Sequence, residues 1–377
     1  MTDAECHEPE ASPGDSGRPS QLLNPGNMLG QYRIEEVIAT GGMGTVYRAE
    51  HVRLGRTVAL KVLKEEYGKY GELLSRFVTE ARAVNAIDHE NILQVTDFAE
   101  EKASGLHYIV MEHLRGRDLR DLIEIEGPLP PGRCIAIAGQ VAGAVHAAHQ
   151  AGIVHRDLKP GNVFLVERAD GSDFVKILDF GIAKVSDQEI APMGLATHMT
   201  TPGMMLGTPI YASPEQACGK PVDHRTDIYS LGCIIYEMLT GAVPFEGATA
   251  AEIVGKKSYD APPRPSDHQG VKARIPPRLE RLVIRCMAAE PEGRPESMAE
   301  VQAELADVAR ALAAQERRSL GELWHRLAVP AVALWIVTAL LCFAAGAASQ
   351  WLLSTTACRA EPGAAAGPEP VSPARRE

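Results

Sequence analysis

His155-Arg-Asp-Leu-Lys-Pro-Gly-Asn-Val163 is the most informative segment of the chain, together with Leu178-Asp-Phe-Gly181 farther along. The two stretches contain a lysine, an amide and two carboxylates, which are groups that bind phosphate and Mg²⁺. Asp-Phe-Gly alone would be weak evidence, because short strings recur by chance and this one is typical of a turn. The two stretches in this order indicate a site that binds magnesium and phosphate.

The residues before this stretch predict a β-rich region. Apolar residues at helical spacing predict an amphipathic helix over residues 72–86. Two further strands are expected around residues 92–98 and 107–111. Strand-like patterns precede the helix at Tyr32–Ile38, Thr45–Ala49 and Thr57–Leu63. This order predicts an antiparallel meander followed by one helix and two more strands.

A glycine-rich turn, Gly41-Gly-Met-Gly44, separates the first two predicted strands. Glycine permits close backbone approach and exposes N–H groups to phosphate oxygens, although such a turn alone fits any hairpin. Lys61 on the third strand is placed to reach the phosphates of a nucleotide beneath the turn. A buried lysine needs a counter-charge, and Glu80 on the following helix is the candidate. In isolation both would be interpreted as surface residues.

Beyond Leu114 the pattern becomes mainly helical, with apolar stripes through residues 135–148 and 228–239. Ser297 and Glu300 form a capping-box pattern at the start of a last helix. We therefore expect a small β-rich lobe at residues 29–112 and a larger helical lobe at residues 113–312.

These motifs resemble those of the eukaryotic-like (Hanks-type) protein kinases, and among them the bacterial membrane-anchored Ser/Thr kinases. The resemblance implies an α+β, two-lobed kinase fold, ATP and Mg²⁺ as cofactors, and transfer of the γ-phosphate to Ser/Thr hydroxyls of proteins, this chain included. The ordered motifs are the glycine turn, Val58-Ala-Leu-Lys61, Glu80, the two stretches quoted first, Gly207-Thr-Pro-Ile-Tyr-Ala-Ser-Pro-Glu215, Asp227-Ile-Tyr-Ser-Leu-Gly232 and Arg294.

The resemblance implies specific roles for the polar residues. Asp157 would orient the acceptor hydroxyl and take its proton, and Lys159 would contact the γ-phosphate. Asn162 and Asp179 would hold magnesium ions, while Lys61 would contact the α- and β-phosphates with Glu80 as its partner. Structural roles are implied for His155, for Arg156, for Asp227 as a support of the catalytic loop, and for Glu215 and Arg294 as a buried ion pair.

The same resemblance implies an ATP-binding pocket between the lobes. Its predicted residues are Ile38, Gly41, Gly42, Gly44, Val46, Ala59, Lys61, Met111, Glu112, Leu114 and Phe164. Adenine would lie between Val46 and Ala59 above and Phe164 below, with Met111 as gatekeeper. One position departs from the family pattern, because Ala39 stands where the first loop glycine is expected. A methyl group is compatible with the loop if φ stays below zero there.

Control by phosphorylation is a further hypothesis. Thr200 and Thr201 lie ahead of the substrate-binding segment, and Arg156 is the cation with which a phosphate on that loop would pair. Lys159 and Thr208 match the Ser/Thr branch of the family. Unmodified, solvent-exposed threonines are the alternative for Thr200 and Thr201.

Composition narrows the functional classes. The formal charge of −11, from 38 basic and 49 acidic residues, gives no general attraction for nucleic acid, so no nucleic-acid partner is expected. The 7 cysteines are scattered without paired spacing, which argues against a disulfide framework or a zinc cluster.

The two ends differ from the body of the chain. Residues 1–28 are acidic and rich in Pro, Gly and Ser, and predict a disordered tail. Residues 329–351 lack charge and are long enough for a transmembrane helix, with a buried core helix as the alternative. Residues 313–328 would be juxtamembrane. Arg310, Arg317, Arg318 and Arg326 lie within about twenty residues of the span on this side, whereas the short extracytoplasmic tail at 352–377 has Arg359 nearby and Arg375 and Arg376 farther off. This bias predicts a single-pass protein of the bacterial cytoplasmic (inner) membrane, kinase domain inside.

Two other functions remain open at this point. A pseudokinase would keep the fold and act as a scaffold, but the retained Lys61, Asp157 and Asp179 favour catalysis. A small-molecule kinase would use the same fold, and Gly207-Thr-Pro with Ser213-Pro-Glu215 favours protein substrates instead. A small-residue face in the predicted membrane helix makes a homodimer possible.

Overall fold

The computed structural model of the protein describes residues 22–42, 44–68, 71–180, 209–318, 338–343 and 345. The chain divides into two compact units, Met1–Ala311 and Leu312–Glu377. The predicted tail at residues 1–21, the threonines at 200 and 201, and residues 352–377 lie outside the described residues.

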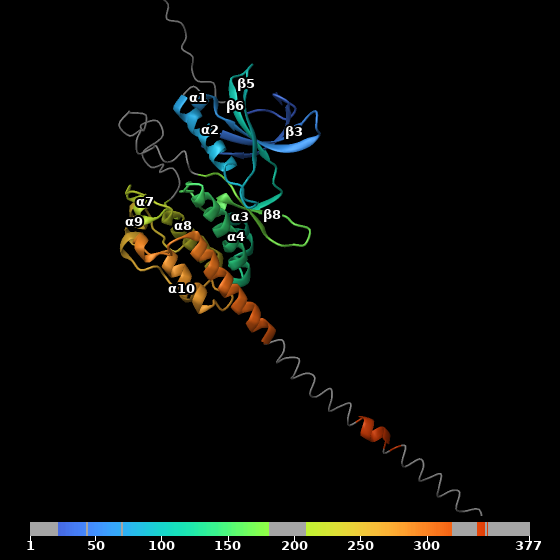
Figure 1. Cartoon of the computed structure of the whole chain (residues 1–377), viewed down its shortest axis with the longest axis vertical. Helices are drawn as coiled ribbons and strands as arrows, with labels where there is room; N and C mark the ends of the chain where they lie inside the picture. The colour runs from blue at the N-terminus through green and yellow to red at the C-terminus, as the bar shows by residue number, and fades with distance from the viewer. Residues whose placement is uncertain are drawn as a thin grey trace, which may run out of the picture. The chain divides into compact units, whose positions relative to one another are not determined.

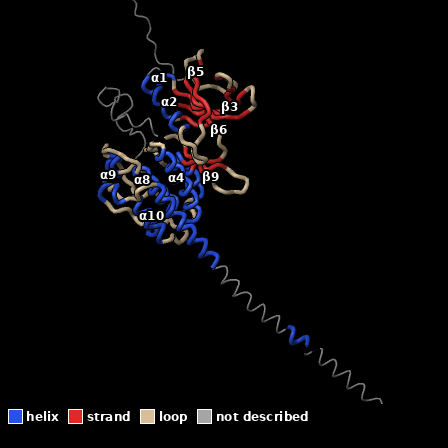
Figure 2. Tube along the Cα trace, viewed as in Figure 1, coloured by secondary structure: helices blue, strands red, loops and turns tan. Residues whose placement is uncertain are grey.

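The first unit begins with a six-stranded antiparallel sheet (Figures 1 and 2). Its order is β1-β2-β3-β4-β6-β5. Alternate residues of these strands point inward, and Ile34, Tyr47 and Leu60 pack with Tyr108 in one buried cluster. The strands are β1 Met28–Leu29, β2 Tyr32–Thr40, β3 Gly44–His51, β4 Arg56–Leu63, β5 Val95–Glu101 and β6 Leu106–Glu112.

Residues 22–28, which the sequence assigned to the tail, contact this sheet. Leu23 packs against the buried cluster, and its backbone N–H donates to the Tyr47 hydroxyl at 3.1 Å. The contacts of the chain with this sheet therefore include residues before the predicted boundary at residue 29.

Two helices, α1 Glu65–Gly68 and α2 Gly71–Asn85, lie beside the sheet (Figure 1). Phe77 and Ala81 of α2 pack against Leu63 and Ile109 of the strands, as the amphipathic pattern predicts. The side chain of Glu80 lies outside the described part of the structure, so its pairing with Lys61 stays a prediction.

The strand predicted around residues 92–98 begins only at Val95. Ile92 instead forms an isolated parallel bridge with Ile177, and the Leu93 N–H donates to the Ile177 carbonyl at 3.0 Å. Both Ile92 and Leu93 are buried, so their apolar pattern reflects packing against β9 and not membership of β5.

The second part of this unit is mainly helical, with a three-stranded sheet β7-β8-β9 beside it. The strands are β7 Gly116–Asp118, β8 Val163–Val166 and β9 Phe174–Ile177. The helices are α3 Leu119–Glu126, α4 Pro131–Gln150, α7 Pro214–Ala217, α8 Arg225–Thr240, α9 Ala250–Tyr259 and α10 Pro277–Cys286, with 3₁₀ turns at Pro160–Asn162, Pro265–Asp267 and Pro291–Gly293.

Helix α8 is the centre of this helical part, because nearly every one of its residues is buried. It packs against α4 on one side and α10 on another. Gly232 makes the second contact possible, since a β-carbon there would lie 2.8 Å from Cβ of Cys286. Burial of each large apolar side chain contributes roughly 1.5–3 kcal/mol, so α8 is the main support of the helical lobe.

A further helix covers residues 298–318. Ser297 caps it by accepting the Glu300 N–H at 3.3 Å, and the Glu300 carboxylate accepts the Glu296 N–H at 2.7 Å. The predicted capping pair is therefore used, although the reciprocal bond reaches the residue before the cap. Arg285 of α10 joins Glu300 and Glu304 in ion pairs that tie this helix to the domain.

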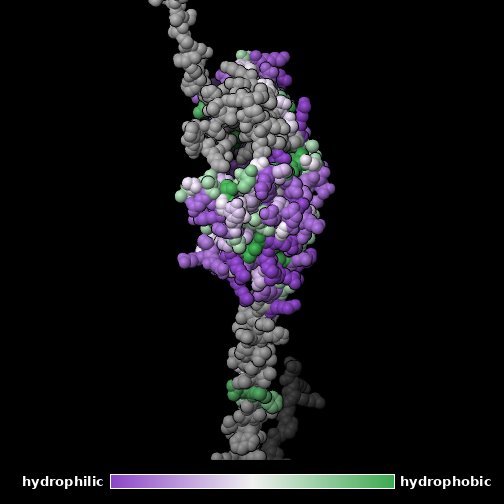
Figure 3. Space-filling view, turned by 90° about the vertical axis from the view of Figure 1, so that its left-hand side faces the viewer, coloured by the Kyte–Doolittle hydropathy of each residue, from purple (hydrophilic) through white to green (hydrophobic). Residues whose placement is uncertain are grey.

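Within the described residues, no helix combines the length and the apolar character needed to cross a bilayer. Most of the predicted span at residues 329–351 lies outside those residues. Its described portion at 338–343 is helical and exposes Leu340, Leu341 and Phe343. In the face shown in Figure 3 the described surface of the first unit is mainly hydrophilic.

Candidate active site

Residues 155–162, the predicted catalytic loop, lie between α4 and β8 and hold Asp157 by short polar contacts. Lys159 Nζ donates to Asp157 Oδ2 at 2.9 Å, and Asn162 Nδ2 donates to the Asp157 carbonyl at 2.8 Å and to Oδ2 at 3.3 Å. The 3₁₀ turn at Pro160–Asn162 brings these side chains together. These contacts fix the position of the Asp157 carboxylate.

Asp179, directly after β9, meets a residue of the other lobe. Lys61 Nζ of β4 donates to Asp179 Oδ1 at 2.8 Å. Partial desolvation beside the protein surface acts to raise the pKa of Asp179, but the charge and hydrogen bond of Lys61 outweigh it and hold that pKa below its ordinary value. The contact brings the predicted phosphate-binding cation next to the predicted magnesium ligand.

Asp227 at the start of α8 fixes the backbone of the catalytic loop. Its carboxylate accepts the N–H groups of His155 and Arg156, each at 2.9 Å, and contacts His149 Nε2 at 2.7 Å. Arg156 has φ of 61°, a left-handed conformation that a non-glycine residue adopts only when its surroundings enforce it. The bond from the Arg156 N–H to Asp227 helps to hold this conformation.

His155 lies under the Asp-Phe-Gly segment and is fully buried. Its ring packs on Phe180 with centroids 4.6 Å apart. Burial lowers the pKa of His155, because the charged imidazolium is disfavoured away from water. The geometry gives His155 a packing role between the catalytic loop and Phe180.

The glycine turn closes a hairpin between β2 and β3. The Gly41 N–H donates to the Gly44 carbonyl at 2.8 Å, and β-carbons built at Gly41 or Gly42 would meet no atom closer than 3.6 Å. Among the described residues Arg156 is the only non-glycine with positive φ, so Ala39 satisfies the condition set above. The methyl group of Ala39 is therefore compatible with its backbone.

The predicted adenine pocket gathers between the lobes. Ala59 and Met111 are buried together, with Val46 and Leu114 partly buried against them. The same cluster contains Leu93 and Leu178, which the sequence analysis missed. Leu178 directly precedes Asp179, and that adjacency was the signal for it. Ile38 is exposed near the end of β2, and Phe164 is half-buried on β8.

The connector between the lobes is tied at Glu112. Its carboxylate accepts the Gln94 N–H at 2.8 Å and Lys176 Nζ at 2.7 Å. Lys176 also donates to the Ile92 carbonyl at 3.2 Å. Lys176 was not among the predicted site residues, although a lysine in the otherwise apolar strand Phe174–Ile177 is a signal for a polar partner. These contacts fix the chain at the edge of the adenine pocket.

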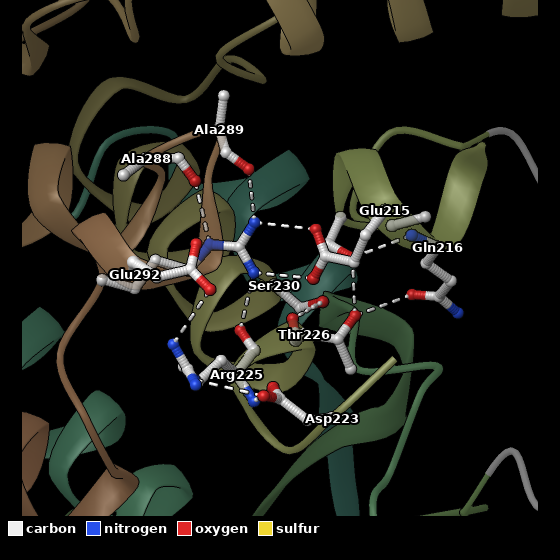
Figure 4. Close-up of polar contacts among 12 residues, drawn as sticks. Glu215, Gln216, Asp223, Arg225, Thr226, Ser230, Ala288, Ala289 and Glu292 are labelled. Atoms are coloured by element: carbon white, nitrogen blue, oxygen red, sulfur yellow. Dashed lines mark hydrogen bonds and ion pairs between the residues drawn. The ribbon is translucent and has the colours of Figure 1, made fainter. Parts of the chain in front are cut away.

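Glu215 and Arg294 form a bidentate ion pair in the helical lobe. The two guanidinium–carboxylate contacts are 2.7 and 2.8 Å long, and the Arg294 side chain is fully buried. Arg294 also donates to the carbonyls of Ala288 and Ala289 (Figure 4). Burial acts to raise the pKa of Glu215, but the hydrogen bonds of Arg294 keep it below the ordinary value.

The residues fit a magnesium ion that takes most of its ligands from phosphate and water. Asn162 donates its amide N–H groups to Asp157, which leaves its side-chain oxygen as an acceptor. Asp179 offers a carboxylate whose side chain is 56% exposed. Within the described residues no cluster of three or more His, Cys, Asp or Glu forms a metal cage. Such a sparse set is typical of Mg²⁺ at a nucleotide.

The chain is similar to known proteins in sequence and in fold. A family model described as "Protein kinase domain" matches residues 32–305. The serine/threonine-protein kinase pkn3 of Myxococcus xanthus is 41% identical over 275 residues, which cover 73% of this chain and 49% of that protein. The chain thus spans about half the length, or less, of the curated relatives that it matches.

Solved structures show the same fold. The crystal structure of the Mycobacterium tuberculosis PknI kinase domain matches with a TM-score of 0.56 and 27% identity, and covers 76% of this chain and 99% of that one. A crystal structure of Rad53 1-466 in complex with AMP-PNP matches with a TM-score of 0.58 and 25% identity, over 72% and 64% of the two chains.

Proposed function

Since this chain belongs to the protein kinase family, we propose that it is a bacterial serine/threonine protein kinase that transfers the γ-phosphate of ATP to protein hydroxyls. The observation that carries the proposal is a pair of contact sets: Lys159 and Asn162 bond to Asp157, and Lys61 bonds to Asp179. A backbone bond from Leu178 N–H to the Asn162 carbonyl at 2.9 Å joins the two sets. A scaffold without turnover has no need to keep all five groups in these contacts.

The chemistry requires positioning and charge neutralisation, with no covalent intermediate. Asp157 orients the acceptor hydroxyl and takes its proton, and Lys159 stands beside it to neutralise charge on the transferred group. Asn162 and Asp179 would hold Mg²⁺, which supplies positive charge to the phosphate oxygens when bound. Lys61, which contacts Asp179, would supply positive charge to the α- and β-phosphates when nucleotide is bound.

The deciding experiment measures transfer of labelled phosphate from ATP and Mg²⁺ to the chain itself and to dephosphorylated casein. Wild type is expected to label both. Asp157→Asn is expected to lose at least about 100-fold in rate, because the amide cannot accept the proton. Unchanged nucleotide binding in Asp157→Asn is the control for folding. Nucleotide binding without any transfer by wild type would favour the pseudokinase scaffold, and transfer to small molecules only would favour a small-molecule kinase.

We also propose that residues 329–351 anchor the protein in the cytoplasmic membrane with the kinase domain inside. Support comes from the absence of charge between Leu327 and Cys358 and from the exposed Leu340 and Phe343 of the described helix. The full chain should sediment with bacterial membranes and require detergent for release. A chain ending at residue 326 should stay in the supernatant, and equal behaviour of both would contradict the anchor. Dimerisation through this helix would appear as cross-linking lost in the shorter chain.

Phosphorylation of Thr200 or Thr201 is proposed as the activating event. Arg156, next to Asp157, is the cation that would form an ion pair with the phosphate on that threonine. Enzyme carrying both Thr200→Ala and Thr201→Ala should have the low activity of phosphatase-treated wild type. Full activity of the double variant after the same treatment would exclude this switch.

A further inference from the structure

Lys257 in the last turn of α9 is 1% exposed, although lysine is almost never buried unless its charge is satisfied. The preceding residue behaves in the ordinary way. Lys256 keeps 40% of its side chain exposed and pairs with Glu252 one turn earlier. Two adjacent lysines of one helix therefore have opposite environments, and only one of them needs a structural explanation.

The Lys257 ammonium uses all three of its donors on one short backbone segment. Nζ donates to the carbonyls of Pro209 at 2.6 Å and Ala212 at 2.7 Å, and also to the carbonyl of Ile210. The Tyr229 ring of α8 lies 5.2 Å from Nζ, within range of a cation–π contact. The segment 209–212 is therefore folded around a buried cation.

The same segment is connected to the catalytic loop. Ser230 of α8 donates to the Tyr211 carbonyl at 2.9 Å, next to the residues that Lys257 holds. A few residues on, Gln216 Nε2 donates to the carbonyl of Arg156 at 2.6 Å, and Gln216 also contacts Thr226 (Figure 4). Arg156 directly precedes Asp157. The backbone held by Lys257 is thus fixed relative to the residue proposed to accept the proton.

Segment 209–212 belongs to the motif Gly207–Glu215, which favours protein over small-molecule acceptors. We propose that Lys257 is a positioning residue for the acceptor polypeptide: its ammonium fixes segment 209–212 as the ledge along which the chain carrying the acceptor hydroxyl lies in front of Asp157. This inference rests on the proposed kinase function. If the ammonium is removed, three carbonyls lose their donor and the ledge must move to find others.

The charge of Lys257 also gives this ledge a dependence on pH. Burial lowers the pKa of Lys257 to about 8, partly offset by Cys233. The titratable groups that face it are Tyr229 and Cys233 of α8, and Arg294 lies 5.1 Å from the same Tyr229 ring. Below that pH the ammonium satisfies three carbonyls, and above it the neutral amine has only two N–H donors. Acceptor binding should therefore weaken as pH rises through about 8.

The test compares Lys257→Met with Lys256→Met in the full chain in detergent, using dephosphorylated casein as acceptor. For Lys257→Met the KM for casein should rise roughly tenfold or more while the KM for ATP stays unchanged, because several charge-assisted bonds to the ledge are lost. Lys256→Met should match wild type in both constants. Thermal unfolding and binding of an ATP analogue establish that each variant is folded.

A second readout is the pH profile. In wild type and Lys256→Met the KM for casein should increase above about pH 8, and in Lys257→Met it should be flat. If Lys257→Met does not fold, the wild-type profile decides alone, and a flat profile overturns the proposal. A casein KM equal to wild type in folded Lys257→Met overturns it as well. Failure of wild type to label itself or casein would instead remove the proposed kinase function.

Discussion

The catalytic loop and the glycine turn contribute to the same candidate site but are held in place by different means. The loop is fixed from within the helical lobe, since Asp227 is fully buried and accepts two of its N–H groups. The turn is held by its own hairpin. Lys61, on the strand after that hairpin, is joined to the other lobe through its ion pair with Asp179. The backbone of the catalytic loop is therefore held by a buried group of the helical lobe, whereas the glycine turn is held by a backbone bond of its own hairpin.

The largest expected difference between the two lobes concerns their ion pairs. Arg294→Met leaves the Glu215 carboxylate buried without its partner, and the free energy of unfolding should fall by about 3–5 kcal/mol. Arg33→Met removes the exposed pair with Glu50 on the β-sheet and should change it by only about 0–1 kcal/mol. Urea unfolding of both variants beside wild type measures the two values. Similar losses of unfolding free energy in the two variants would show that burial does not explain the difference between the two ion pairs.

The second expected effect concerns the packing of α8, which carries Asp227. Gly232→Ala would place a β-carbon 2.8 Å from Cβ of Cys286 and 2.9 Å from Cγ of Met287. The free energy of unfolding should fall by about 1–3 kcal/mol, because α8 and α10 must separate. The measurement is again urea unfolding, together with the rate of phosphate transfer, since α8 positions the catalytic loop.

Gly139→Ala in α4 is the matched control for that variant. A β-carbon at Gly139 would meet no atom within 4 Å, so the substitution should stabilise the helix by about 0.5–1 kcal/mol. If Gly139→Ala destabilises as much as Gly232→Ala, the close approach of α8 to α10 is not the reason for the glycine.

Residues with a fixed order along the chain could be predicted from the sequence, and residues defined by distant partners could not. The motifs place Lys61, Asp157 and Asp179 in one site because their order along the chain resembles that of the protein kinases. Lys256 and Lys257 look identical in the sequence, yet one is exposed and the other is buried under segment 209–212. No residue near Lys257 in the sequence predicts that its partners are carbonyls more than forty residues away.

Interlobe contacts show the same limit. Ile92 and Leu93 have the apolar pattern of a strand, but their backbone pairs with β9, which comes much later in the chain. The local pattern predicts correctly that such residues are buried, but it does not predict their partner. Periodicity shows which face of a segment is buried and does not show which element packs against that face. Lys176 was missed for the related reason that its partner Glu112 belongs to another strand.

The smallest expected effect tests the nucleotide side, at the position where the sequence departs from its family. Ala39 has φ below zero and pairs with Val46 across the hairpin, so its methyl group causes no backbone strain. Ala39→Gly should therefore change kcat/KM for ATP by less than about threefold, with a small loss of stability from the added freedom of the strand. Steady-state kinetics at saturating acceptor, with ATP varied, measure this.

Gly41→Ala is the comparison that gives the small effect its meaning. A β-carbon at Gly41 meets nothing closer than the Gly44 carbonyl at 3.6 Å, so the hairpin itself tolerates it. Any rise in the KM for ATP in Gly41→Ala must then come from the approach of the nucleotide to the turn. If Ala39→Gly raises kcat/KM for ATP about tenfold, the methyl group of Ala39 does restrict nucleotide binding. The geometry of the hairpin would then not be sufficient to explain how the glycine turn binds nucleotide.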